Sequence, residues 1–232
     1  MHILVISSCT GKKGDRPNRF SSGDALLGLN HIRTMEARHP ADLVPAEILY
    51  TGGQHMNLME GIEAWRASGN FLDFHIVSAG YGIVPCDQKI VSYEVTFQGR
   101  TIPDIQNRAG ILGIPSAFRR LLSKPGYDLA LLLLGKSYLT ACDPFAGWKP
   151  SGKVLAFCDK DWRKTLGKVY NVVAVSANQS GAKTFGAGVL ALKGKLGTLV
   201  LQRVLENHEF LNELFAENAD VLGLLKSGYH YA

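Results

Sequence analysis

The chain is poor in cysteine, and its cysteines and histidines lack the spacings that are typical of metal and redox centres. No two of the four cysteines stand at C-x-x-C spacing, which argues against a zinc knuckle or a thioredoxin-like site. The seven histidines include no H-E-x-x-H and no H-x-x-x-H pair. We therefore expect no metal site and no cofactor, and we expect free thiols in a reducing cytoplasm.

Long hydrophobic runs are missing too. The run at 129–134 is far too short to span a bilayer. The apolar run near the amino terminus, Ile3 to Ile6, is short, and no basic region precedes it, so we expect no signal peptide. These observations predict a cytoplasmic protein without a membrane partner.

Three common site signatures are also absent. The sequence has no G-x-x-x-x-G-K-[ST] phosphate loop, no G-x-G-x-x-G dinucleotide fingerprint and no G-x-S-x-G nucleophile elbow. A P-loop NTPase, a dinucleotide-dependent enzyme and an α/β-hydrolase are therefore poorly supported. The net charge of +5 and the sequence pI near 9.0 permit an anionic partner, although an ordinary basic enzyme surface explains them equally well.

The 232 residues alternate between strand-like and helix-like segments, which predicts one α/β domain spanning 1–232. We expect a largely parallel sheet flanked by helices on both faces. The expected strands are 3–6, 71–77, 129–134, 153–158 and 169–175, and residues 46–50 are expected to form a second strand or an extended segment. The expected helices are 24–38, 54–67, 103–122 with a break near Gly113, 195–205 and 209–215.

Small and polar residues follow three of these strands, at Ser7-Ser8-Cys9, Ser78-Ala79-Gly80 and Gly135-Lys136-Ser137. Ligands of open α/β sheets bind at the carboxyl ends of the strands. We therefore expect the first two of these loops to lie side by side and to share a concave pocket.

The first loop combines hydroxyl, lysine and thiol side chains. Ser8, Thr10, Lys12 and Lys13 are suited to surround an anion such as phosphate. Cys9 stands close in sequence to the two lysines, and neighbouring cations favour the nucleophilic thiolate. A solvated loop and a small buried thiol are the structural alternatives.

The second loop carries Ser78, Tyr81, Gly82, Asp87 and Tyr93. A tyrosine can stack on a base or bond to a phosphate or sugar. Asp87 has the chemistry of a general acid or base. A tyrosine-rich turn in which the carboxylate caps a backbone group is an equally good interpretation.

Other strand-end residues are weaker candidates. Lys136 and Tyr138 would enlarge the anion site, and Asn178 would contact a base or sugar through its amide. His55 is expected at a helix start, where a capping or surface position is favoured over the strand-end cleft. For each of these residues a purely structural position is the commoner outcome.

Residues 1–100 resemble a loose YaaA-like superfamily of bacterial peroxide-stress proteins and small bacterial and phage proteins. Its pattern, S-x-x-Y-G-[ILV]-x-P-x-D-x-x-I-x-x-Y, is matched at Ser78, Tyr81, Gly82, Ile83, Pro85, Asp87, Ile90 and Tyr93. The resemblance implies DNA binding or a stress response, and relatives in this wider group act on modified nucleobases.

The spacing of Cys9 and Lys13 is similar to part of the Cys-x-x-x-Lys motif of archaeosine synthase. Gly14 and Asp15 replace the Pro-Tyr that follows in that family. Together these resemblances imply an enzyme acting on a nucleobase, nucleotide or nucleic acid, such as a nucleobase-modifying transferase or a glycosidase-type hydrolase. Cys9 or Asp87 would carry the chemistry, and a non-catalytic DNA-binding protein is the alternative.

Overall fold

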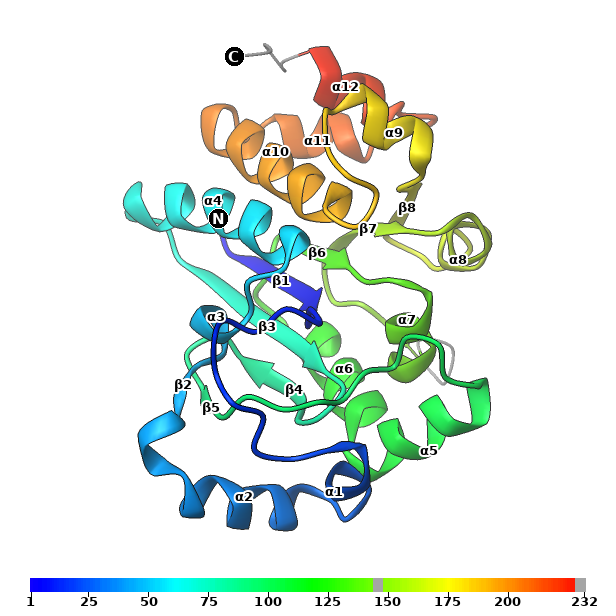
Figure 1. The fold of residues 1–232 in the computed structure, drawn as a ribbon. Helices are drawn as coiled ribbons and strands as arrows, with labels where there is room; N and C mark the ends of the chain where they lie inside the picture. The colour runs from blue at the N-terminus through cyan, green and yellow to red at the C-terminus, as the bar shows by residue number, and fades with distance from the viewer. Residues whose placement is uncertain (144–147, 228–232) are drawn as a thin grey trace.

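The computed structural model describes residues 1–143 and 148–227 and shows a six-stranded sheet with helices on both faces (Figure 1). The strand order is β4-β3-β1-β6-β7-β8, and every neighbouring pair is parallel except β3 and β4. The expected α/β fold with a largely parallel sheet is confirmed. The strands are β1 Ile3–Ser8, β3 Leu72–Ser78, β4 Gly82–Pro85, β6 Leu129–Leu133, β7 Lys153–Cys158 and β8 Val172–Ser176.

Two long helices, α4 (Gly53–Ala67) and α10 (Leu192–Glu206), pack against each other over one face of the sheet (Figure 1). The other face is covered by α5 (Ile102–Ile111), α6 (Ile114–Ser123) and α7 (Lys136–Cys142). The remaining helices are α1 Ser22–Leu26, α2 Leu29–Arg38, the 3₁₀ turn η1 Pro40–Asp42, α3 Ala46–Leu49, α8 Lys160–Leu166, α9 Gln179–Thr184, α11 Phe210–Leu214 and α12 Val221–Ser227.

The central strand β1 is buried along its whole length, because β3 and β6 flank it and helices cover both faces. A strand buried on both faces reads as a continuous apolar run, which is the pattern of Ile3 to Ile6. Leu49, Trp65 and Phe74 are all buried in the core.

Two sequence expectations need correction. Residues 46–50 form helix α3 and its cap instead of a strand, and the backbone N–H of Ala46 is bonded to Gln88 O across the β2 (Val44–Pro45) and β5 (Lys89–Ile90) pair. The expected helix 24–38 divides into α1 and α2 at Gly28, whose φ of 85° is a left-handed conformation that favours glycine.

The short antiparallel strand β4 was not expected from the sequence. Gly82, with a φ of 84°, turns the chain directly back along β3, so that Ser78 pairs with Gly82 and His75 with Pro85. The chain therefore leaves the carboxyl edge of the sheet again after Gly82. This reversal decides where the residues of the second loop lie.

Within 1–143 and 148–227, no helix is both long enough and apolar enough to cross a membrane.

Candidate functional site

A cavity of about 580 Å³ opens at the carboxyl ends of β1 and β6. After β1 the next strand of this sheet is β3, on one side of the β1–β6 pair, and after β6 the next strand is β7, on the other side. Such a switch point is where open α/β sheets leave a crevice for a ligand. The lining residues are Ser8, Cys9, Thr10, Gly11, Lys12, Gly52, Gly53, Gln54, Thr96, Gln98, Gly135, Lys136, Ser137, Tyr138, Leu190 and Lys193.

Gln54, in the first turn of α4, holds the two strand ends together beneath this cavity. Its buried Nε2 lies 3.0 Å from Ser7 Oγ, 3.2 Å from Ser8 Oγ and 2.9 Å from Leu133 O. One amide group thus bonds to the ends of both β1 and β6. The floor of the cavity is consequently fixed by a side chain from a different element.

The loop after β1 lies directly against the start of α4. Thr10 Oγ1 accepts a hydrogen bond from Gly52 N at 3.2 Å and donates one to Lys12 O at 2.9 Å. A Cβ atom on Gly52 would stand 2.6 Å from Thr10 Cβ, a distance that real contacts do not reach. The close approach of loop and helix therefore requires glycine at this position.

The cavity is positively charged. It is lined by Lys12, Lys136 and Lys193, and none of its described lining residues is Asp or Glu. The amino end of α4, which has no side-chain cap, adds the partial positive charge of a helix dipole. A concave site of this charge attracts an anion, and phosphate is the anion that helix amino ends and lysines commonly hold together.

Lys193 is the least exposed of these three cations. Burial lowers the pKa of its ammonium group, while Cys158 and Asp159 oppose that shift. The other two side chains are more accessible, and Lys136 Nζ lies 3.9 Å from Asp161 Oδ2. A bound anion would relieve the desolvation of Lys193 by supplying an opposite charge.

Cys9 and Tyr138 meet in the wall of the same cavity. Cys9 Sγ lies 3.0 Å from Tyr138 Oη, and both side chains are largely buried. The backbone N–H of Cys9 donates to Val77 O at 2.9 Å, which continues the β1–β3 ladder and fixes the position of the cysteine. The thiol therefore faces a basic cavity beside a tyrosine hydroxyl.

The loops after β1 and β3 lie side by side, as expected, but they meet through a buried tyrosine cluster. Tyr93 Oη lies 2.7 Å from Tyr50 Oη and 2.6 Å from Ser78 Oγ. Lys13 Nζ stands 4.3 Å from the centre of the Tyr93 ring, and burial lowers the pKa of this lysine. Tyr81 Oη accepts from Val91 N at 3.1 Å.

The structure brings Ser8, Cys9, Thr10, Lys12 and Lys136 together in the cavity wall. The other sequence candidates are not part of its lining: Lys13, Ser78, Tyr81, Gly82, Asp87 and Tyr93. This cavity is therefore not the shared pocket that we expected for the two loops.

Asp87 lies furthest from the expected arrangement. It is exposed in the turn after β4, where Cys86 N bonds to Phe74 O in the middle of β3. The antiparallel course of β4 carries Asp87 back from the carboxyl edge, so it cannot face Cys9 across the cavity.

Sequence reasoning missed Gln54, Thr96, Gln98 and Lys193. Lys193 is separated from the first loop by most of the chain and reaches the cavity only because α10 packs on α4. His55 lies neither in the cleft nor on the surface. It is buried, its Nε2 bonds to Glu47 O at 2.8 Å, and desolvation lowers its pKa.

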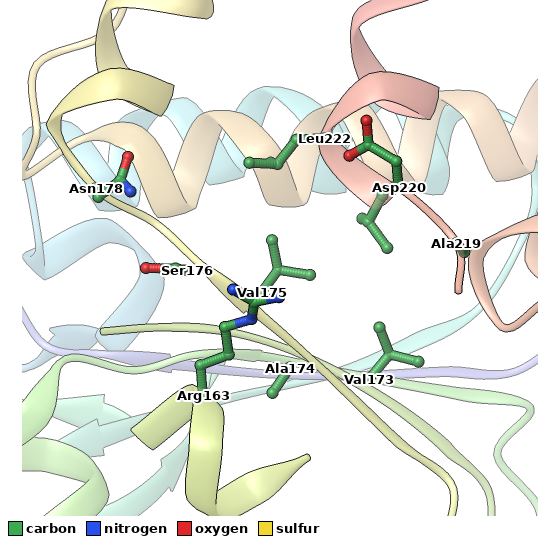
Figure 2. Close-up of a pocket in the computed structure, with 10 residues that line it drawn as sticks. Arg163, Val173, Ala174, Val175, Ser176, Asn178, Ala219, Asp220 and Leu222 are labelled. Atoms are coloured by element: carbon green, nitrogen blue, oxygen red, sulfur yellow. The ribbon is translucent and has the colours of Figure 1, made fainter. Parts of the chain in front are cut away.

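A second, smaller pocket of about 280 Å³ follows the free edge of β8 (Figure 2). Arg163 extends from α8 toward Val175, while Asp220 lies on the side of α12. Asn178 accepts a hydrogen bond from Gly181 N at 3.0 Å and so caps α9. The amide that we considered for base recognition therefore has a structural partner, and the mixed charge of this pocket does not favour an anion.

Among residues 1–143 and 148–227, no group of three or more His, Cys, Asp or Glu side chains is arranged to hold a metal ion. Comparison with known proteins gives no match to any family model and none to a curated protein.

Proposed function

We propose that the protein is an enzyme that acts on a phosphate-bearing nucleotide or nucleobase derivative bound in the cavity between β1 and β6. The observation that carries this proposal is the charge of the cavity. Three lysines and the amino end of α4 surround it, and its described lining contains no carboxylate. A neutral or cationic substrate would leave the half-buried Lys193 without an anionic ligand in the cavity.

The size and the other polar groups of the cavity support a nucleotide. Its volume of about 580 Å³ lies within the usual range for small-molecule sites. Thr96, Gln98 and Ser137 supply amide and hydroxyl groups of the kind that read the edge of a base or a sugar. The resemblance of residues 1–100 to YaaA-like proteins and their nucleobase-linked relatives favours the same class of substrate.

Cys9 is the nucleophile in this proposal. Among the described side chains that line the cavity, it is the strongest nucleophile once deprotonated. At a glycosidic bond, Cys9 Sγ would attack the anomeric carbon while the carbon–nitrogen bond breaks and the base leaves, taking a proton from water. Water then cleaves the sulfur–carbon bond in a glycosidase-type hydrolase, whereas an incoming base displaces the sulfur in a transferase. Asp87 takes no part, because it lies on the exposed turn after β4.

Binding of DNA by surface charge alone is the competing function. It would draw on exposed side chains such as Lys12, and its affinity would fall steeply with salt. The half-buried Lys193 inside the cavity suits a small ligand better than a duplex. Nucleotide binding should therefore depend most on Lys193, whereas DNA binding should depend most on exposed lysines such as Lys12.

Nucleotide binding can be tested by calorimetry with mono- and diphosphates of each base, in parallel with single- and double-stranded DNA. We expect saturable binding of a mononucleotide that weakens by about 10- to 150-fold in Lys193→Gln, since a charge-assisted contact contributes about 1.5–3 kcal/mol. Lys149→Gln, an exposed lysine outside the cavity lining, is the control and should leave binding unchanged. Absence of saturable nucleotide binding would refute the proposal, and DNA binding equally sensitive to both substitutions would support the competing function.

A further inference from the structure

We propose that Tyr138 is the positioning residue for Cys9, donating a hydrogen bond that holds the thiolate toward the cavity. This inference rests on the proposed function, in which Cys9 is the nucleophile. It adds a residue outside the part of the chain that carries the family resemblance. It also assigns a role to the one described tyrosine that lines the cavity.

The contact follows from the topology of the sheet. Cys9 comes directly after β1, and Tyr138 lies in the first turn of α7, just after β6. Because β1 and β6 are parallel neighbours, their following residues meet at one edge, and Cys9 Sγ stands 3.0 Å from Tyr138 Oη. The ring of Phe97 packs edge-on against Tyr138 with centroids 5.5 Å apart, which restricts its orientation.

The chemistry of the pair sets the direction of the hydrogen bond during catalysis. Burial, followed by the proximity of Cys9, raises the pKa of Tyr138 well above its ordinary value. The phenol is therefore protonated at neutral pH and is able to donate a hydrogen bond. A neutral hydroxyl then faces a thiolate, and a charge-assisted hydrogen bond to the sulfur is the favourable arrangement.

The other described tyrosines near this region have different partners. Tyr50 and Tyr93 bond to each other, and Tyr81 accepts from the backbone. No other cysteine is among the described residues that line the cavity, and burial raises the pKa of Cys86 to about 11 and that of Cys158 to about 12. Tyr138 and Cys9 thus form a tyrosine–thiol pair at the wall of the basic cavity.

The test is the alkylation of Cys9 by iodoacetamide across a range of pH, followed for each cysteine by peptide mass spectrometry. Tyr138→Phe should slow the reaction at neutral pH by about tenfold and move its pH profile to higher pH, because the thiolate loses a charge-assisted hydrogen bond. Tyr127→Phe is the matched control: it removes a buried hydroxyl that bonds to Leu122 O outside the cavity lining, and it should leave the profile in place.

An unchanged profile in Tyr138→Phe would overturn the inference. If that variant does not fold, a fluorinated tyrosine at position 138 keeps the ring and makes the phenol a stronger donor, so the profile should then move to lower pH; no movement is again contradictory. Adding nucleotide to the native protein tests the proposed function separately. Protection of Cys9 supports nucleotide binding whatever the effect of Tyr138, and its absence counts against the function alone.

Discussion

At the scale of single residues, the site depends on buried hydrogen bonds that join a side chain of one element to groups of another. Gln54 is the clearest case, because its amide bonds to Ser7, Ser8 and Leu133 at once. All of these groups are buried or nearly so. Removing the amide would leave a buried carbonyl and two hydroxyls without their donor, which costs more than the net value of the bonds themselves.

Gln54→Leu, which keeps the approximate volume, should therefore lower the free energy of unfolding by about 1–3 kcal/mol. It should also weaken ligand binding, since the ends of β1 and β6 lose their common partner. Urea denaturation and calorimetry measure the two effects. Gln98→Leu, at an exposed position of the same cavity, is the control and should leave stability nearly unchanged. Equal stability of the two variants would show that Gln54 does not hold the strand ends.

At the scale of elements, the packing of α4 on α10 places Lys193 in the cavity. The two helices approach closely enough that a Cβ atom on Gly194 would stand 2.0 Å from Gln54 O, and one on Gly61 would stand 2.7 Å from Thr198 Cα. Backbone atoms on the other helix cannot yield as a flexible side chain can. Glycine is thus required at both positions for the helices to cross at this distance.

Gly194→Ala should force the helices apart and lower the free energy of unfolding by about 1–3 kcal/mol through overpacking. Because Gly194 follows Lys193, nucleotide affinity should fall as well. Gly110→Ala is the reference: nothing lies within 4 Å of its Cβ position in α5, so alanine should stabilise the helix by about 0.5–1 kcal/mol. Thermal unfolding of both variants decides the matter, and a stable Gly194→Ala protein would contradict the close packing.

At the scale of the whole molecule, buried phenols make the fold sensitive to high pH. Burial raises the pKa of Tyr50, Tyr81, Tyr93 and Tyr138 above 10.0. In the unfolded chain these phenols ionise near pH 10, so the unfolded state then binds fewer protons than the folded state. Their contribution to stability is complete below pH 10 and is lost as the pH rises from there through the pKa values of the phenols in the folded state.

The free energy of unfolding should therefore fall steeply above pH 10, and the double variant Tyr50→Phe, Tyr93→Phe should show a shallower fall. Replacing both partners of the bond at 2.7 Å avoids leaving one of the two phenols unpaired. The lowered pKa of Lys13 has the opposite effect on the free energy of unfolding. As the pH rises, the folded state loses this proton before the unfolded state does, which raises the free energy of unfolding. Urea titrations over the alkaline range would measure the slopes. A flat dependence in the native chain would rule out this linkage.

The sequence by itself determined the fold class, the buried central strand and the polar strand ends. A continuous apolar run marks a strand covered on both faces, and parallel strands bring their carboxyl ends to one edge. Cys9, Lys12 and Lys136, which line the cavity, could therefore be expected at that edge from local pattern alone. Secondary structure of this kind depends on residues close together in the chain.

Only the tertiary structure decided which of those residues share a cavity. The antiparallel course of β4 removed Asp87 from the edge, and the tyrosines of the second loop became a buried support behind the first. Gln54 and Lys193 entered the site because α4 and α10 cross at glycine contacts. These outcomes depend on the direction in which a short strand pairs and on the distance between helices remote in sequence, which hydrophobic periodicity does not encode.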